Sequence, residues 1–330
     1  MTRISIVLPV FNGEKYIKKA IDSVLSQSLD DFELIIVNDG STDNTLNIIN
    51  SFDDKRILLI SQDNQGPGAA RNKALKRASG EYMMFLDSDD WFCEDAFKTA
   101  YSEATKNNTD ITIFQIIKYD SGNYSENDWF NLNNFDERFE NRVFNPHECR
   151  DFLFDISVSA CQKIFKREFL ANIGAEFPQG IYFEDMPFFF YTFLKANRIS
   201  IIKKHLYVRQ KHPGSITESV DSKFLDTVPA GQILMDIFIE NDCYDMYKFD
   251  LLAFKINGPR YALMGIEDKY KKQLYTLIKN DYEAIKLTPY YDDYLDNLGP
   301  VKRKFFTDIL KSDDYEEFKT LNQTKSSPAK

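Results

Sequence analysis

The sequence is poor in the residue types that build metal knuckles and redox centres. Its 330 residues contain only 4 cysteines and 3 histidines. The cysteines form no Cys-x-x-Cys pair, and the histidines form no His-Glu-x-x-His arrangement. Zinc knuckles, thiol redox couples and His-Glu-x-x-His metal sites are therefore disfavoured, and the cysteines are expected to be reduced, partly buried thiols.

Long apolar runs and an excess of positive charge are also absent. The longest apolar stretches, such as Ile4–Val10, fall far short of the roughly 20 residues that a membrane-spanning helix needs. The 51 Asp and Glu residues outnumber the 41 Lys and Arg residues, and the resulting net charge of -10 disfavours nucleic acid as a partner. Because the chain begins with a strand-like run and not a signal peptide, and 43% of it is hydrophobic, we expect a folded cytoplasmic protein.

Short β-branched runs alternate with helical stretches over the first part of the chain. The strand-like runs are residues 4–10, 33–38, 57–61 and 82–86. This alternation predicts an α/β fold with a Rossmann-like, mostly parallel sheet flanked by helices. Ligands of such sheets bind beyond the carboxyl ends of the strands. The polar residues expected at these ends are Asn12, Asp39, Asn64 and Asp87.

The remainder of the chain changes from a mixed pattern to a helical one. Further elements are expected at residues 96–106 (helix), 111–119 (strand), 185–196 (helix), 199–202 (strand) and 206–209 (strand). The polar, aromatic stretch at 121–145 resembles an insertion of unassigned structure. Beyond residue 220 the apolar residues recur at helical spacing, which predicts a C-terminal helical appendage. The charged tail at 311–330 is expected to fray.

Three carboxylates follow the apolar run at 82–86, in the order Asp87-Ser88-Asp89-Asp90. Like charges at such short spacing repel, and a hard cation such as Mg²⁺ or Mn²⁺ offsets them well, because these ions commonly bind one or two carboxylates together with substrate phosphates. The alternative is a solvated turn in which Ser88 or Asp90 caps the next helix. The position at a strand end favours the metal.

Asp39 lies at another strand end, in the segment Asn38-Asp39-Gly40-Ser41-Thr42-Asp43. Residues 41–43 are expected to cap the following helix. Asp39 precedes this cap, where its carboxylate could accept a hydrogen bond from a nucleobase or from a ribose hydroxyl.

Residues 66–71, Gly-Pro-Gly-Ala-Ala-Arg, partly match the dinucleotide fingerprint. Arg71 replaces the last small residue, and the segment follows the third strand and not the first, so a nicotinamide dehydrogenase fits poorly. No P-loop motif is present either. A small-residue loop that leads to an arginine can clamp a diphosphate, since guanidinium binds phosphate bidentately. The alternative is that Arg71 is an ordinary surface residue of a helix.

Glu184 and Asp185 precede the apolar run 186–190. One interpretation is that these acids cap a helix and complement its dipole. The other is that a carboxylate at the rim of the crevice serves as a general base for an attacking hydroxyl.

Taken in order, these segments resemble glycosyltransferase family 2, the inverting nucleotide-sugar-dependent enzymes with the GT-A fold. The resemblance covers roughly residues 3–218. The matching segments are Ser-Ile-Val-Leu-Pro-Val-Phe-Asn at 5–12, Val-Asn-Asp-Gly-Ser-Thr-Asp at 37–43, Asn-Gln-Gly through Ala-Arg-Asn at 64–72, Leu-Asp-Ser-Asp-Asp at 86–90, Lys-Ile-Phe-Lys-Arg-Glu-Phe-Leu at 163–170, Phe-Glu-Asp at 183–185, and residues 207–217.

The resemblance implies a domain division and a set of roles. It implies a catalytic domain at 1–219, with a nucleotide-sugar half at about 1–95 and an acceptor half at about 96–219, followed by the helical region 220–330. The implied nucleotide-sugar-binding residues are Pro9, Val10, Phe11, Glu14, Asp39, Asn64, Gly66, Arg71, Asp87, Ser88, Arg209, His212 and Ser215. Within this set, residues 9–11 would line a uridine pocket, Asp39 would bond the uracil edge and Arg71 would lie near the diphosphate. The last three would close a loop over the diphosphate.

The resemblance also implies a mechanism. Asp185 matches the family's catalytic base, with Glu184 orienting the sugar or Asp185 itself. Asp89 and Asp87 match the DxD pair, with Asp89 the expected direct ligand of Mn²⁺ or Mg²⁺. A hexosyl or N-acetylhexosaminyl group would pass from a UDP-sugar to a glycan or lipid-linked hydroxyl in cell-surface polysaccharide or glycoconjugate synthesis.

Three further alternatives stay open at this point. A nucleotidyltransferase also joins such a sheet to metal-binding carboxylates, and an inactive module could bind a nucleotide sugar or glycan without transfer. The segment Val-Lys-Arg-Lys-Phe-Phe at 301–306 either packs its aromatic residues inward or contacts the inner face of the cell membrane peripherally. The helical appendage could also form a homodimer interface.

Overall fold

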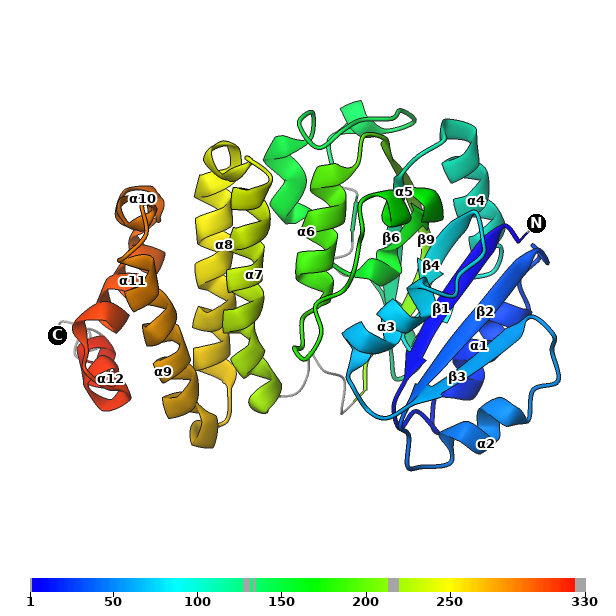
Figure 1. Cartoon of the computed structure of the whole chain (residues 1–330), viewed down its shortest axis with the longest axis horizontal. Coiled ribbons are helices and arrows are strands. Elements are labelled where there is room, and N and C mark those ends of the chain that lie inside the picture. Colours follow the sequence, from blue (N-terminus) through cyan, green and yellow to red (C-terminus); the bar gives the residue numbers. More distant parts are fainter. Residues whose placement is uncertain (1, 127–130, 133–134, 213–219, 324–330) are drawn as a thin grey trace. The chain divides into compact units, whose positions relative to one another are not determined.

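The structure is a computed structural model that describes residues 2–126, 131–132, 135–212 and 220–323 (Figure 1). The described chain forms two compact units. The sheet unit comprises the residues up to Gly180 together with Glu184–His212, and the helical unit comprises Ile181–Phe183 together with the described residues after His212.

A single mixed sheet forms the centre of the sheet unit. Its strands are β1 (Ile4–Val10), β2 (Phe32–Asp39), β3 (Ile57–Gln62), β4 (Tyr82–Phe85), β5 (Trp91–Phe92), β6 (Ile111–Asp120), β7 (Asn123–Ser125), β8 (Lys163–Lys166) and β9 (Ile199–Gln210). They lie in the order β3-β2-β1-β4-β8-β6-β9-β5, and β7 pairs with β6. The predicted fold class, a sheet flanked by helices with further helices at the C-terminal end, is confirmed (Figure 1).

The first four strands pair in parallel, as their sequence pattern predicts. β1 lies between β2 and β4, and all seven of its residues are buried. A strand that is apolar along its whole length suits a parallel sheet, because helices cover both faces. β8 then enters antiparallel between β4 and β6. The four polar termini of the parallel strands therefore meet at one edge of the sheet.

One strand was predicted wrongly as two. Residues 199–202 and 206–209 belong to the single strand β9, which pairs in parallel with β6 along its length. The pairing register shifts between Phe114 and Gln115, so that Ile202 and His205 face adjacent residues of β6. This bulge takes up the two intervening lysines, whose charge hid the continuity of the strand from the sequence pattern.

Helices flank the sheet and occupy the connections between its strands. They are α1 (Ile17–Leu25), α2 (Thr45–Asn50), α3 (Pro67–Leu75), α4 (Ala96–Asn107), α5 (Arg167–Asn172) and α6 (Asp185–Lys195), with 3₁₀ turns η2 (Glu137–Phe139), η3 (Arg150–Asp155) and η4 (Ala160–Gln162). The described part of the unassigned stretch 121–145 contains β7 and η2. Phe135, Phe139 and Phe144 of this stretch pack with Phe152 of η3, with ring centroids 4.8–6.0 Å apart. The stretch and η3 thus share a small aromatic core.

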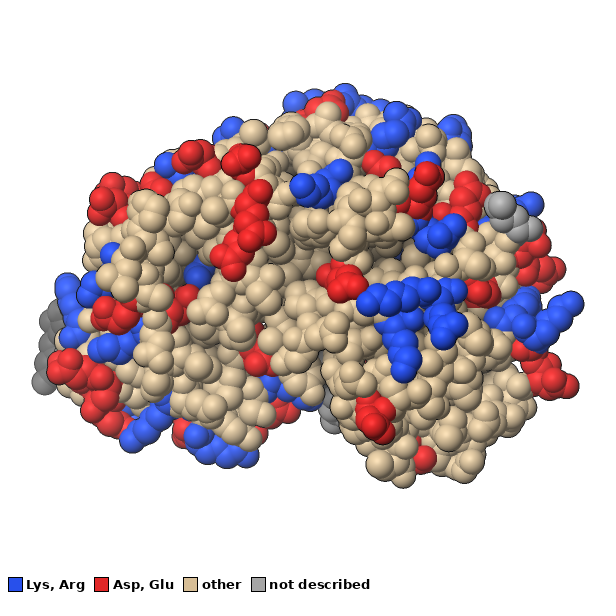
Figure 2. Space-filling view, viewed as in Figure 1, with Lys and Arg blue, Asp and Glu red and all other residues tan. Residues whose placement is uncertain are grey.

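The helices predicted beyond residue 220 from the spacing of apolar residues are confirmed. Its elements are η6 (Ser222–Asp226), α7 (Thr227–Glu240), α8 (Tyr244–Gly265), α9 (Asp268–Ile285), α10 (Tyr291–Asn297), α11 (Pro300–Lys311) and α12 (Tyr315–Gln323). In its interior Lys255 and Asp281 form a buried ion pair at 3.0 Å. No described helix combines the length and apolarity needed to cross a membrane. Acidic and basic side chains are interspersed over the face shown in Figure 2.

Two expectations about the C-terminal helices can now be compared with the structure. The prediction that residues 311–330 fray is wrong for α12, because Phe318 is buried and packs 5.7 Å from both Tyr275 and Phe305. Residues 324–330 lie outside the described chain. On α11, Phe306 is fully buried and Phe305 contacts Tyr282, so the aromatic pair of the basic segment packs inward.

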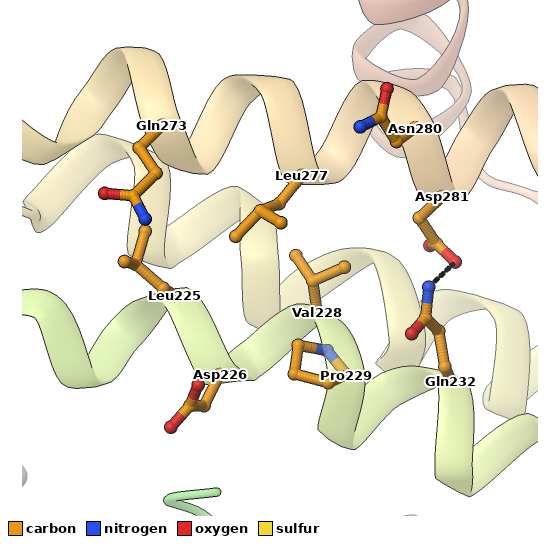
Figure 3. A pocket seen from close by; sticks show the side chains of 9 residues that line it. All are labelled: Leu225, Asp226, Val228, Pro229, Gln232, Gln273, Leu277, Asn280 and Asp281. Atoms are coloured by element: carbon orange, nitrogen blue, oxygen red, sulfur yellow. Dashed lines mark hydrogen bonds between the residues drawn. The ribbon is translucent and has the colours of Figure 1, made fainter.

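The helical unit also contains a cavity of about 410 Å³ between η6, α7 and α9 (Figure 3). Asp281 extends from α9 and accepts a hydrogen bond from Gln232 on α7 at 3.0 Å. The lining residues are Leu225, Asp226, Val228, Pro229, Gln232, Gln273, Leu277, Asn280 and Asp281. None of them belongs to the predicted site, so this cavity and the candidate active site are distinct.

Candidate active site

Arg71 connects three of the predicted segments. Its guanidinium bonds Glu184 through Nη1 and Asp87 through Nη2, the latter at 2.8 Å, and its Nη1 lies 3.6 Å from Oδ1 of Asp185. Arg71 is only 5% exposed, so the alternative of an ordinary surface residue is wrong. The arginine belongs to α3, Asp87 follows β4, and the other two acids open α6. One buried cation therefore joins carboxylates from distant parts of the sequence.

Asp185 has the environment expected of a general base. Its Oδ2 accepts a hydrogen bond from the backbone N–H of Ala160 at 3.3 Å. Its Oδ1 is buried, and within the described chain it has no hydrogen-bond partner. Burial raises the pKa of Asp185, although Arg71 acts in the opposite direction. A carboxylate oxygen with an open acceptor position and raised basicity can take a proton from a hydroxyl.

Glu184 is held more rigidly than its neighbour. It is 6% exposed, and its carboxylate is bonded to Arg71. Burial raises its pKa to about 7, against the opposing effect of Arg71. Its φ and ψ are helical, and its side chain makes no capping hydrogen bond, so the capping interpretation fails for this residue. The ion pair with Arg71 suits a positioning role.

The three acids after β4 point to three different partners. Asp87 bonds Arg71, and Asp89 lies 2.7 Å from Nε2 of His212. Asp90 is 5% exposed and accepts hydrogen bonds from the Tyr207 hydroxyl at 2.8 Å and from a backbone N–H of β9 at 2.7 Å. Asp90 therefore fixes the segment to β9, while the side chains of Asp87 and Asp89 stay partly exposed.

Asp87 and Asp89 fit a divalent cation. Asp89 remains 29% exposed, and burial together with the charge of Asp87 raises its pKa. Two close carboxylates that resist joint ionisation are stabilised by a hard cation. The described residues contain no cluster of three or more metal-ligating side chains. The protein would thus supply at most two carboxylates, as Mg²⁺ and Mn²⁺ sites that also use substrate phosphates do.

Asp39 already has several partners within its own unit. It is 2% exposed, and it accepts hydrogen bonds from Gln62 at 2.7 Å, from the Gln65 N–H at 3.0 Å and from the Gly66 N–H at 2.8 Å. Gly66 has φ +87°, a value that favours glycine. Asp39 thereby shapes the loop that opens α3. A carboxylate has about four acceptor positions, so these three hydrogen bonds leave one of them unused, and the predicted contact with a nucleobase stays a prediction.

The other predicted binding residues surround this edge of the sheet. Val10 is 2% exposed, whereas Phe11 is 49% exposed. Glu14 accepts a hydrogen bond from the N–H of Asn44 at 3.0 Å and so joins the segment after β1 to the start of α2. His212 packs on Tyr16 with ring centroids 4.4 Å apart. Pro9 is buried; Ser88, Gly66 and Arg209 are half-buried; Asn64 is exposed; and Ser215 lies outside the described residues.

Lys163 is a residue near the site that the sequence analysis did not single out. It is fully buried at the start of β8, and its Nζ donates to the carbonyls of Ser157 at 2.7 Å and Ser159 at 2.8 Å. These carbonyls precede Ala160, the residue that bonds Asp185. Burial lowers the pKa of Lys163 to about 7. Nothing in the sequence around Lys163 indicated that its side chain is buried. The only available signal was that Lys163 begins the segment 163–170, which matches the family.

Lys163→Met should lower the free energy of unfolding by about 2–4 kcal/mol, because the two carbonyls would lose their donor in a buried setting. Chemical denaturation monitored by circular dichroism would measure this change. Lys166→Met, at the half-exposed end of the same strand, is the matched control and should change stability by less than about 0.5 kcal/mol. Equal stability of the two variants would show that Lys163 does not anchor this segment.

Comparisons with known proteins agree on one family. Residues 5–165 match the model for glycosyl transferase family 2. Glycosyltransferase GlyG of Streptococcus pneumoniae is 30% identical over 223 residues, which are 64% of this chain and 72% of GlyG. The chain belongs to glycosyltransferase family 2. The family resemblance inferred from the sequence motifs is therefore confirmed.

Two other proteins show how far the similarity extends. Glycosyltransferase GlyA of Streptococcus pneumoniae is 29% identical over 236 residues, 68% of this chain, but this chain spans only 32% of the length of GlyA. A second similar protein is Staphylococcus aureus TarS, whose residues 1–349 were solved in complex with UDP-GlcNAc. The two structures superpose with a TM-score of 0.73 at 22% sequence identity, and the match covers 98% of this chain and 91% of TarS 1–349. This likeness establishes the GT-A fold for the present family 2 chain.

Proposed function

We propose that this family 2 glycosyltransferase transfers a sugar from a UDP-sugar, with inversion, to a hydroxyl of a cell-surface glycan or lipid-linked acceptor. The carrying observation is the buried Oδ1 of Asp185, which lies 3.6 Å from Nη1 of Arg71 and has no hydrogen-bond partner among the described residues. The proposal of a uridine nucleotide is supported by the UDP and UDP-GlcNAc complexes of the similar TarS structure. TarS is named a poly(ribitol-phosphate) beta-N-acetylglucosaminyltransferase, which supports an envelope polymer as acceptor.

The division of labour among the residues follows from their geometry. Asp185 would accept the proton of the acceptor hydroxyl at Oδ1, while the Ala160 N–H and Arg71 hold its carboxylate in place. The hydroxyl oxygen would attack the anomeric carbon opposite the nucleotide, and the bond to the diphosphate would break. A cation held by Asp89 and Asp87 would stabilise the charge on the departing diphosphate.

The sequence analysis predicted that Arg71 binds the diphosphate of the donor, but we propose a different role for it. Its charge is already matched by Glu184, Asp87 and Asp185 in the described site. We therefore assign it the positioning of these carboxylates. We also propose that transfer takes place in the cytoplasm and resides in residues 1–219, with 220–330 as an accessory region.

Nucleotide release from a panel of UDP-, GDP- and TDP-sugars, with and without Mn²⁺ or Mg²⁺, should identify the donor. We expect slow, metal-dependent release of UDP from one sugar, and loss of this release in Asp89→Ala. Membership of family 2 disfavours the alternative that the protein is a nucleotidyltransferase. If the protein is instead an inactive binding module, it should bind UDP in calorimetry but release no nucleotide from any donor. Release that is independent of metal and unchanged in Asp89→Ala would contradict the metal assignment.

Asp22→Ala is the matched control for the Asp89 variant. Asp22 lies on α1, is exposed and pairs with Lys18. This variant should release UDP at the rate of the unmodified enzyme, so that any loss in Asp89→Ala can be attributed to the site. Release of GDP or TDP but not UDP would overturn the uridine assignment while leaving a transferase in place.

A further inference from the structure

The chain passes from one unit to the other directly before the proposed catalytic acids. Residues 181–183 belong to the helical unit, whereas the next two residues, Glu184 and Asp185, belong to the sheet unit. All other described residues of the helical unit follow His212, so contacts and not sequence position join this short segment to it. One peptide bond connects Phe183 to Glu184. The backbone at Phe183 therefore sets the direction in which the chain enters α6.

Phe183 has a backbone conformation that its side chain disfavours. Its φ is +65°, in the left-handed region. Glycine adopts such a φ readily, but for a bulky residue it is a genuine outlier, because Cβ crowds the following carbonyl oxygen. An outlier of this kind persists only where surrounding contacts hold it, and such residues gather at functional sites. Glu184 returns to helical values, with φ -59° and ψ -24°, so the chain turns sharply directly before the two acids.

Three contacts from η6 hold the segment. The carboxylate of Asp226 accepts a hydrogen bond from the backbone N–H of Tyr182 at 2.9 Å. The ring of Phe183 packs edge-on against Phe224, with 5.4 Å between the ring centroids. Nζ of Lys223 lies 5.4 Å from the centroid of the Tyr182 ring, within the range of a cation–π contact. Together Lys223, Phe224 and Asp226 form what we call the η6 clamp.

Within the η6 clamp, Asp226 makes the contact with the main chain. It is half-buried, and burial raises its pKa, whereas the hydrogen bond from Tyr182 acts in the opposite direction. In Figure 3 its carboxylate points away from Leu277, so Asp226 borders the cavity while its oxygens face elsewhere. Because the peptide unit is planar, a hydrogen bond to its N–H fixes the orientation of the main chain. Asp226 is therefore the clamp residue best placed to hold the turn at Phe183.

We propose that Asp226 is a positioning residue for sugar transfer. It holds the N–H of Tyr182 and thereby keeps Phe183 left-handed, and the turn at Phe183 directs Asp185 toward the acceptor hydroxyl. Asp226 acts through the main chain and does not itself touch the substrate. This role rests on the proposed function, because it presupposes Asp185 as the base.

The alternative role for the η6 clamp is purely structural. In that case its contacts would attach the segment 181–183 to the helical unit and add to stability alone. A simple attachment needs no outlier in φ, however, and here the outlier stands two positions before the proposed base. Backbone strain kept at such a place favours a role in the reaction.

Paired substitutions at Phe183 separate the backbone from the ring. Phe183→Gly and Phe183→Val both remove the ring, but only glycine adopts a φ of +65° without strain. We expect kcat for UDP release from the donor found in the nucleotide panel to be at least about 10-fold lower in the valine variant than in the glycine variant, because small misplacements of a reacting group slow a reaction strongly. Calorimetry should give both variants the same affinity for UDP.

An Asp226 series tests the hydrogen bond itself. Asp226→Ala removes the acceptor for the Tyr182 N–H, whereas Asp226→Asn keeps an oxygen that can accept it. Asp226→Ala should lower kcat for UDP release by about 10-fold or more, and Asp226→Asn should restore most of this loss. Asp236→Ala, an exposed acid on α7 of the same unit, is the matched control and should change nothing. A lower unfolding temperature in Asp226→Ala with an unchanged kcat would overturn the positioning role.

Amide hydrogen exchange provides a readout that does not need transfer. In the first turn of α6 the N–H of Phe188 donates to the carbonyl of Glu184 at 3.3 Å. If the η6 clamp holds this turn, the Phe188 amide should exchange at least about 10-fold faster in Asp226→Ala than in Asp226→Asn. Failure of the unmodified chain to release nucleotide from any donor would refute the proposed function, and the exchange of Phe188 would still test the clamp. Unchanged exchange at Phe188 would overturn the proposal, as would equal kcat in the two Phe183 variants.

Discussion

Asp185→Asn should abolish sugar transfer while leaving the affinity for UDP within about threefold of the unmodified enzyme. The amide keeps the size of the side chain but cannot accept a proton. Because general-base catalysis contributes roughly 10²–10⁴-fold, we expect kcat to fall by at least 10²-fold. Transfer kinetics with the donor found in the nucleotide panel, together with calorimetric UDP binding, would measure the two effects separately.

The pH profile provides a second test of this role. Burial raises the pKa of Asp185, and the base works only when it is deprotonated. Transfer should therefore decline as the pH falls through a pKa above the ordinary Asp value of about 3.9. Asp155→Asn, an exposed acid of the same unit, is the control and should change neither kcat nor the profile. Weakened UDP binding with transfer preserved would refute the assignment of Asp185.

Arg71→Met should be the most destabilising of the substitutions considered for the sheet unit. It removes the cation that Glu184, Asp87 and Asp185 share, and it leaves Glu184 and Asp185, whose side chains are the more buried, without a compensating charge. Breaking a buried ion pair in this way costs about 3–5 kcal/mol. We expect a loss of this size in urea denaturation and a loss of transfer, even under conditions in which the variant is folded.

The double variant Arg71→Met with Glu184→Gln separates charge from packing. If the destabilisation comes from uncompensated charge, neutralising Glu184 should recover a large part of it while transfer remains lost. Lys73→Met on the same helix is the matched control, because Lys73 is exposed and the change should stay within about 0.5 kcal/mol. If Arg71→Met unfolds at the same urea concentration as the Lys73 variant, the cluster contributes no net stability.

The sequence could predict the parallel half of the sheet because its signal is local. The run Ile4–Val10 and the three that follow it are apolar along their length, and each ends at a polar residue. Burial of both faces requires this composition, so the pattern and the structure have the same cause. The β9 strand was divided in the prediction because Lys203 and Lys204 lie at a bulge, which is a property of its pairing with β6.

Buried charge explains what the sequence could not predict about the site. Arg71, Asp90 and Lys163 are each 5% exposed or less, yet single-sequence reasoning treats such residues as solvated or as ligand contacts. Their partners lie up to 120 positions away, as in the bond from Gln210 to Asp90. Residue types at strand ends indicated where the candidate site lies, but the pairing of its side chains depends on tertiary structure.

The ion cluster around Arg71 has a consequence for the order of events during synthesis. Glu184 follows Arg71 by 113 positions, and neither acid of α6 can reach the arginine until the chain between them has folded. Closing so long a segment is slow compared with forming β1 to β3 and their helices. A nascent chain that ends before residue 184 would hold Arg71 and Asp87 without the proposed base, Asp185. The proposed catalytic centre is therefore completed late, only after residue 185 has left the ribosome.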